Sequence, residues 1–356
     1  MQTIDSDTHV IETERTWDFM EPGDRKYRPV LVGSRGDSPI EYWIVDGGFW
    51  GAARFSDRDF KKLSHLAGRD MEAPRETREM DDIQRRLQHM DELGVDIQVL
   101  YPSIFIMAGA TRPEVDVAVC RGYNRWLAHI WSQSTDRLPW VCVPPLLSMP
   151  DSLDELRWSR ERGAVGVFMR GVEGQRLLHD PYFFPLYEEA QRLDLPITVH
   201  IGNSNPDMTA MLAQHSEGGG TFWSLRLALV GAFHALVLSG VPERFPRLRF
   251  GFIEGASQWI PYVLNDLQRR RPGLCGGVIS DILRANRLYV TCQTNEDIAY
   301  LTNLIGEGNL LIGTDYGHND SASELTALRN LRGGGRITPE QYRKITHDNP
   351  KTFYGL

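Results

Sequence analysis

The chain has 356 residues, of which 41% are hydrophobic and 24% charged, as in a globular protein with a large core. Its formal net charge of −8 argues against the basic surface that nucleic-acid binding requires. We expect no membrane span, and the first residues lack a basic segment followed by an apolar stretch, so no secretory signal is expected. Four scattered cysteines without CxxC spacing fit a reducing compartment, so we expect a cytoplasmic protein.

The first expected strand ends at the motif Asp7-Thr8-His9, and a polar, broken segment follows from about residue 14 to residue 79. Within this segment, residues 29–32 and 41–45 predict a pair of strands, and prolines and glycines interrupt the rest. An insertion of this size usually covers a functional site. We therefore expect the segment to form a cap or an oligomer contact.

From Asp81 onward, apolar strand patterns alternate with helical patterns. Continuous apolar strands are typical of a parallel sheet that is buried on both faces. With the opening strand we count about eight, which predicts a single (β/α)8 TIM barrel over residues 1–356 with its insertion over the rim. A doubly wound open sheet is the alternative, but no GxGxxG follows a first strand. The expected strands are 95–101, 140–143, 164–169, 197–200, 248–253, 288–292 and 310–313, and the expected helices are 83–93, 124–130, 153–160, 187–193, 224–239, 262–269 and 297–305.

Histidine and acidic residues stand at four of the expected strand ends. Asp7 and His9 follow the first strand, His200 the fifth, Glu254 the sixth and Asp315 the eighth. Catalytic side chains of such barrels lie at the carboxyl ends of the strands, and a spacing of two places Asp7 and His9 on one face. Because His, Asp and Glu are common ligands of divalent metals, we expect a metal site there.

Four further residues are candidates for the same site. His318 adds a ligand, acts as an acid–base group, or only hydrogen-bonds to the backbone. Counting it gives three histidines and three carboxylates, enough for two ions, and this mixed set suits iron or manganese as well as zinc. Arg170, at the end of the fourth strand, binds a substrate carboxylate or forms an ordinary salt bridge. His215, in the loop after the fifth strand, and Trp50, in the insertion, are candidates for substrate contact.

These motifs resemble the amidohydrolase-related family, the branch of the amidohydrolase superfamily that contains aminocarboxymuconate semialdehyde decarboxylase and the γ-resorcylate-type decarboxylases. The resemblance covers nearly the whole chain. It implies a metal-dependent barrel that is a homodimer or larger, with Asp7, His9, His200 and Asp315 as the metal ligands. It is carried by Asp7-Thr8-His9, His200, Gly313-Thr314-Asp315-Tyr316, His347-Asp348-Asn349-Pro350, and residues 86–102, 239–246 and 353–356.

Two positions depart from the pattern of this family. The decarboxylases have a histidine after the sixth strand, where this chain has Glu254, a poorer proton donor at neutral pH unless its pKa is raised. The hydrolases with two metals often use a carboxylated lysine from the fourth strand, where this chain has Arg170. A few members that resemble this branch are dinuclear non-haem oxygenases, and a carboxylate-rich ligand set fits that class better than it fits decarboxylation.

Three functions therefore stay open for a small-molecule substrate. The first, which we favour, is O2-dependent hydroxylation of a small carboxylate-bearing compound at two iron or manganese ions, with Asp315, Glu254 and His318 as catalytic residues. The second is a mononuclear hydrolase or non-oxidative decarboxylase with zinc or another divalent ion, in which Asp315 orients or deprotonates the attacking water. The third is a catalytically silent subunit that forms a hetero-oligomer with a paralogous chain.

Overall fold

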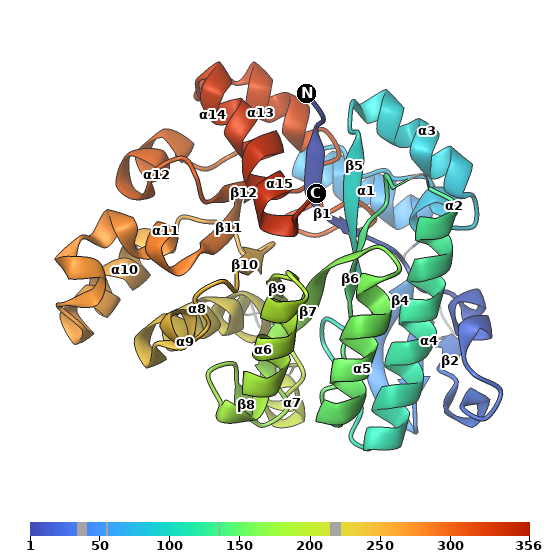
Figure 1. Cartoon of the computed structure of the whole chain (residues 1–356). Coiled ribbons are helices and arrows are strands. Elements are labelled where there is room, and N and C mark those ends of the chain that lie inside the picture. The colour runs from blue at the N-terminus through green and yellow to red at the C-terminus, as the bar shows by residue number, and fades with distance from the viewer. Residues whose placement is uncertain (34–40, 55, 135, 214–221) are drawn as a thin grey trace.

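The computed structural model describes residues 1–33, 41–54, 56–134, 136–213 and 222–356. In this part of the chain, eight parallel strands form the centre and helices surround them (Figure 1). A short strand, β8 (Arg176–Leu177), pairs antiparallel with the fourth of them. The order in the sheet is β1 (Ile4–His9), β5 (Ile97–Tyr101), β6 (Trp140–Cys142), β7 (Ala164–Glu173), β9 (Ile197–Asn203), β10 (Phe250–Ile253), β11 (Leu288–Cys292) and β12 (Leu310–Ile312).

The segment after β12 lies beside β1 and nearly closes the barrel. The backbone N–H of Asp315 donates to the carbonyl of Asp7 at 3.0 Å, and that of His9 donates to the carbonyl of Tyr316 at 2.7 Å. Gly313 permits this approach, because a Cβ at that position would lie 2.2 Å from the Cβ of Asp7. The predicted eight-stranded parallel barrel is therefore confirmed.

Local sequence signals set the helix boundaries. Helix α3 (Ile83–Leu93), for example, begins after Asp82, whose carboxylate accepts from the N–H of Arg85 at 2.9 Å, and ends at Gly94 with φ of 75°. The other barrel helices are α4 (Pro113–Ser132), α5 (Met149–Arg160), α6 (Phe184–Arg192), α7 (Pro206–Ala213), α8 (Leu227–Ser239), α9 (Val241–Arg244), α10 (Ile260–Arg270), α11 (Ile282–Asn286), α12 (Ile298–Ile305), α13 (Ala327–Gly333), α14 (Pro339–Arg343) and α15 (Asn349–Tyr354). Short 3-10 or π-helical turns are η3 (Pro181–Phe183), η5 (Phe222–Arg226), η6 (Leu274–Gly277), η7 (Ile279–Asp281) and η8 (Lys344–Asp348).

One barrel helix is more apolar than we expected from the sequence. By length and composition alone, the run Phe222–Ser239 is a candidate to cross a membrane, although we expected no membrane span from the sequence. The core helix of a globular domain passes the same test. Phe233 and Leu236 of α8 are fully buried, and α8 packs along β7 and β9. The helix therefore serves as one of the layers that cover the barrel.

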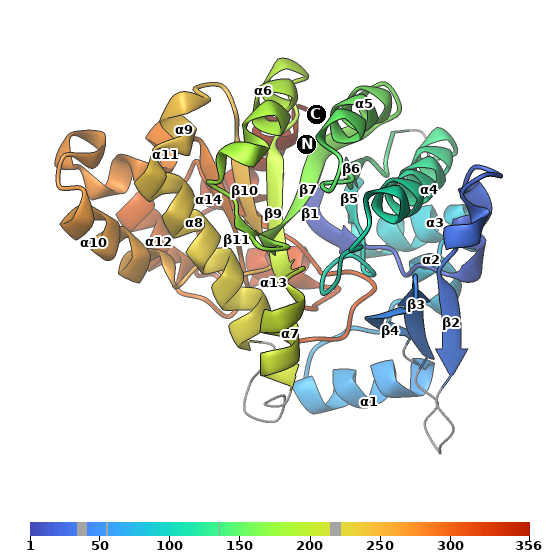
Figure 2. The same ribbon diagram turned by 90° about the horizontal axis from the view of Figure 1, so that it is seen from below.

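The insertion forms the predicted cap over the carboxyl-terminal mouth of the barrel. Figure 2 shows α1 and the small sheet on the same side as α7, which follows the carboxyl end of β9, and both chain termini on the opposite side. The predicted pair of strands is present, but a third strand and α1 were not predicted. The cap consists of η1 (Glu14–Phe19), η2 (Arg25–Tyr27), the antiparallel strands β2 (Val30–Gly33), β3 (Glu41–Val45) and β4 (Gly48–Arg54), α1 (Asp57–Ala67) and α2 (Arg75–Arg78).

Candidate metal centre

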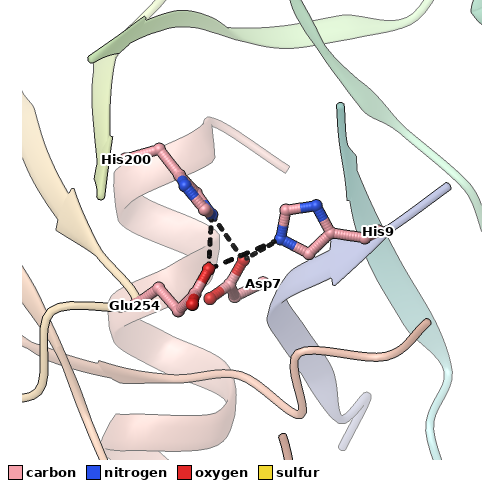
Figure 3. Close-up of side chains that lie close together, drawn as sticks. All are labelled: Asp7, His9, His200 and Glu254. Atoms are coloured by element: carbon pink, nitrogen blue, oxygen red, sulfur yellow. Dashed lines mark ion pairs between the residues drawn. The ribbon is translucent and has the colours of Figure 1, made fainter. Parts of the chain in front are cut away.

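Side-chain atoms from four strand ends converge on one buried centre. His9 Nε2 lies 3.4 Å from Asp7 Oδ1, 3.4 Å from Asp315 Oδ1 and 3.7 Å from Glu254 Oε2. His200 Nε2 lies 3.5 Å from Asp7 Oδ1 and 3.1 Å from Glu254 Oε2. Figure 3 shows four of these side chains pointing toward one another. The structure therefore brings together the five residues that the sequence placed at strand ends.

The five converging atoms are all buried and make no regular hydrogen bond, although Asp315 Oδ1 forms an ion pair with His318 Nδ1 at 2.9 Å. A buried polar group without a partner costs about 1–3 kcal/mol, and more when it is charged. Their separations of 3.1 to 3.7 Å are those of neighbouring ligands that each lie about 2.1 Å from one ion. The donor set of two imidazoles and three carboxylates therefore fits a divalent cation.

The second nitrogen of each imidazole is fixed by a backbone carbonyl. His9 Nδ1 lies 3.0 Å from the carbonyl oxygen of Pro102, and His200 Nδ1 lies 3.0 Å from that of Ile201. Since a carbonyl only accepts, both Nδ1 atoms carry a proton, and the Nε2 atom of each ring faces the centre. A backbone carbonyl that holds one ring N–H leaves the other nitrogen to bind a metal, as is usual for metal-binding histidines.

Without a cation, the carboxylates of the centre repel one another. Burial, together with the charge of Asp315, raises the pKa of Glu254 well above its usual range. Burial also raises the pKa of Asp315 to about 6. Burial alone would raise the pKa of Asp7 as well, but the imidazoles of His200 and His9 outweigh it and lower that pKa. A divalent ion would relieve the repulsion and keep all three groups ionised.

Two of the candidate ligands lie at sharp turns of the backbone. Glu254 has φ of 66° and Asp315 has φ of 51°, a left-handed conformation that costs a residue with a Cβ about 1 kcal/mol. Hydrogen bonds hold both turns: the N–H of Glu254 donates to Thr291 Oγ1 at 2.7 Å. Beside Asp315, Thr314 donates to the Asp5 carboxylate from its N–H at 2.9 Å and from its hydroxyl at 2.6 Å. The turns aim both carboxylates at the centre.

His318 lies at the edge of the centre, but both its ring nitrogens are engaged. Nδ1 lies 2.9 Å from Asp315 Oδ1 and Nε2 lies 2.8 Å from Ser103 Oγ, which itself donates to the carbonyl of Val10 at 2.8 Å. The ring stacks on His9 with centroids 3.7 Å apart. His9, Glu254, Asp315 and His318 form a second group of candidate ligand atoms, but three of these residues also serve the first centre.

A cavity of about 310 Å3 opens from this centre toward the cap. Glu254 and His318 line it on the barrel side, and Trp50 and Phe60 line it on the cap side. Trp50 is buried and packs edge-on against Phe105, with ring centroids 5.8 Å apart. Trp50 therefore lines the cavity, and its contact with a substrate stays a prediction.

Two other predicted contacts have a different outcome. Arg170 does not line this cavity: its guanidinium lies 2.6 Å from the Glu173 carboxylate and donates to the carbonyls of Phe105, at 2.8 Å, and Ala108. Arg170 therefore forms the ordinary salt bridge that was the alternative prediction, and its contacts do not support a role in substrate binding. His215 lies outside the described residues.

The sequence reading missed two acidic residues near the centre. Asp320 lines the cavity, and its neighbour Ser323 donates to Asp315 Oδ2 at 2.5 Å. Glu12 is buried and accepts from the N–H groups of Ser103 at 3.0 Å and Ile104 at 3.1 Å. Glu12 follows His9 and Asp320 follows Asp315, each within five residues. This closeness in sequence to an expected ligand is the signal by which both could have been predicted.

Comparison with known proteins places the chain in one family. The family model described as amidohydrolase matches residues 4–356. The chain is 25% identical to a 2-amino-3-carboxymuconate-6-semialdehyde decarboxylase of Dictyostelium discoideum over 65% of either chain, so the match spans less than two thirds of that relative. It is 26% identical to a 2-keto-4-carboxy-3-hexenedioate hydratase of a Sphingobium strain, over 65% of this chain and 68% of the relative.

Solved structures show the same fold. An amidohydrolase from Mycobacterium avium subsp. paratuberculosis superimposes with a TM-score of 0.78 at 17% identity, covering 100% of this chain and 98% of the other. A 2,6-dihydroxybenzoate decarboxylase from Rhizobium superimposes with a TM-score of 0.67 at 18% identity, covering 100% and 99%.

Proposed function

This chain belongs to the amidohydrolase family, and from that premise we propose that it is a lyase that uses one divalent ion to decarboxylate or hydrate a small organic acid. The observation that carries the proposal is the set of five buried ligand atoms that converge on one centre, four of them without a partner outside it. The relatives named above, two decarboxylases and a hydratase, support lyase chemistry. The complete ligand set and the cavity beside it favour an enzyme over a catalytically silent subunit.

In the proposed reaction, Asp7, His9, His200, Asp315 and Glu254 hold the ion. When bound, the ion supplies a Lewis acid that polarises an oxygen of the substrate. Decarboxylation breaks the bond to the carboxyl carbon, releases CO2 and leaves the electron pair on the substrate carbon, which then needs a proton. His318 is the best-placed donor, because it lines the cavity and the Asp315 carboxylate raises its pKa against the opposing effect of burial.

The carboxylate-rich centre leaves a second candidate, the dinuclear oxygenase. Both oxygens of Glu254 are buried without a partner, and Asp320 faces the same cavity, so Glu254 can bridge toward a second ion. This alternative needs His318 to exchange its contacts with Asp315 and Ser103 for a metal bond, and for that reason we place it second.

The proposal is tested by assaying the metal-loaded protein for CO2 release and for hydration, with 2,6-dihydroxybenzoate among the organic acids. The variant His9→Ala provides the matched control, since it removes a ligand that does not line the cavity. Turnover of at least one acid that needs the metal and proceeds without O2 supports the lyase. Turnover that occurs only with consumption of O2 contradicts it and favours the second candidate.

A further inference from the structure

We propose that the substrate carries a single acidic group on an apolar body of one or two rings, and that the cavity rejects a second carboxylate. This inference rests on the proposed function, because the acidic group is the part that meets the metal centre. The rest of the substrate must then be accommodated by the cavity walls, and their composition determines which bodies fit.

The walls of the cavity are mainly apolar. A volume of about 310 Å3 is at the lower end of the range that holds drug-sized ligands. Hydrophobic side chains bury apolar surface favourably, at about 25 cal/mol per Å2, and so select a hydrophobic body. The cap contributes aromatic side chains and the barrel aliphatic ones: Ile11, Trp50, Phe60, Ile104, Ile106, Met107, Ile201 and Leu225.

Among the described residues that line the cavity, one carries a permanent positive charge, and its guanidinium is already engaged. Arg78 Nη2 lies 2.6 Å from Asp57 Oδ1, and Nη1 donates to the carbonyl of Ala73 at 2.6 Å. The guanidinium also lies over the ring of Phe60, 4.2 Å from its centroid. His318 is held by Asp315, as described above. A substrate carboxylate that does not reach the ion therefore meets no described cation that is ready to receive it.

The remaining charges of the cavity are negative. Besides Glu254, whose charge the proposed ion would balance, Glu79 and Asp320 line it, and Glu79 is paired with Arg75 at 2.9 Å. Asp320 accepts from the N–H of Ala322 at 2.6 Å and is exposed on the cavity side. A second carboxylate would lose water and face this like charge with the neutral amide of Asn319, and no free cation among the described lining residues, to receive it, which is costly. A hydroxyl or amine on the apolar body would instead find an acceptor in Asp320.

Calorimetric titration of the metal-loaded protein with 2-naphthoate and naphthalene-2,6-dicarboxylate tests the inference, since the two probes share one ring system. We expect 2-naphthoate to bind at least about tenfold more tightly. The variant Met107→Arg places a cation in the wall, and we expect it to tighten dicarboxylate binding by about tenfold. Tyr262→Arg, on the exposed face of α10, adds the same charge away from the cavity and should leave both affinities unchanged.

The outcomes separate the two proposals. The inference is overturned if the dicarboxylate binds as tightly as 2-naphthoate, or if 2-naphthoate does not bind to protein that contains its metal. Neither result contradicts the proposed metal centre. Binding of 2-naphthoate that is equally tight after metal removal overturns the proposed function, and the inference with it.

Discussion

His318 is the partner of Asp315, because its Nδ1 lies 2.9 Å from Asp315 Oδ1 while Ser103 Oγ holds the other nitrogen. This contact distinguishes the metal ligand from the acid–base group, two roles that the sequence alone could not assign to one residue or the other. Asp315 Oδ1 also faces the metal centre, 3.4 Å from His9 Nε2, whereas both ring nitrogens of His318 are already engaged. The two residues should therefore respond differently to substitution.

Replacing His318 by glutamine should leave the metal bound and remove most of the activity. Loss of a positioned acid–base group typically costs about 10²–10⁴-fold in rate. The measurement is metal content and turnover of purified His318→Gln beside Asp315→Asn, which should lose metal as well. Metal loss in His318→Gln equal to that in Asp315→Asn would show that His318 is a ligand.

Replacing either imidazole ligand by alanine should reduce bound metal. Substitutions of outer contacts of a metal ligand cost about 10–100-fold in affinity, and loss of the ligand itself should cost more. His9→Ala and His200→Ala are compared with His89→Ala, a half-buried histidine that hydrogen-bonds Tyr316 outside the centre. Normal metal affinity in both ligand variants would mean that the centre has been misplaced.

The Glu254→Gln variant should bind metal more weakly but retain the fold. Glutamine keeps an oxygen ligand and removes one of three carboxylate charges, so affinity should fall by about 10–100-fold. The metal-free variant should also be more stable than the metal-free wild type at neutral pH, because burial beside Asp315 raises the pKa of Glu254 and folding must then protonate it, a cost that glutamine lacks. Thermal unfolding with and without chelator measures both effects. A metal-free variant that is less stable than wild type would contradict the electrostatic account.

Much of the barrel was predictable because its strands are buried on both faces. All residues of β5, β9 and β11 are buried, so each appears in the sequence as a mainly apolar run between helical patterns. The same regularity placed Asp7, His9, His200, Glu254 and Asp315 at carboxyl ends of strands. The carboxyl ends of all barrel strands lie at the same mouth. A residue predicted at such an end is therefore expected close to the others in space.

The parts that escaped prediction depend on contacts distant in sequence. Arg170 has the right position on β7, but Glu173 and the loop carbonyls of Phe105 and Ala108 hold its guanidinium away from the cavity. The role of Glu12 depends on backbone N–H groups more than 90 residues away. The cap strand β4, with glycines at Gly48 and Gly51, has a weak strand pattern and was missed.

Glu12 predicts a pH dependence of stability. Burial raises its pKa from the ordinary value of 4.5 to about 7. The folded protein then binds this proton more tightly than the unfolded chain does, so the contribution of Glu12 to stability falls as pH rises from about 4.5 to about 7. The loss is on the order of 3 kcal/mol. Glu12→Gln should lack this component, so its stability relative to wild type should increase over that range in chemical unfolding experiments. A pH-independent difference would contradict the assignment.

The number of divalent ions bound per chain tests the central claim most directly. The five converging ligand atoms surround one centre, and the nitrogens of His318 are occupied, so elemental analysis of purified, metal-saturated protein should give one ion per chain. A value of two ions per chain would contradict the mononuclear account and support the dinuclear site.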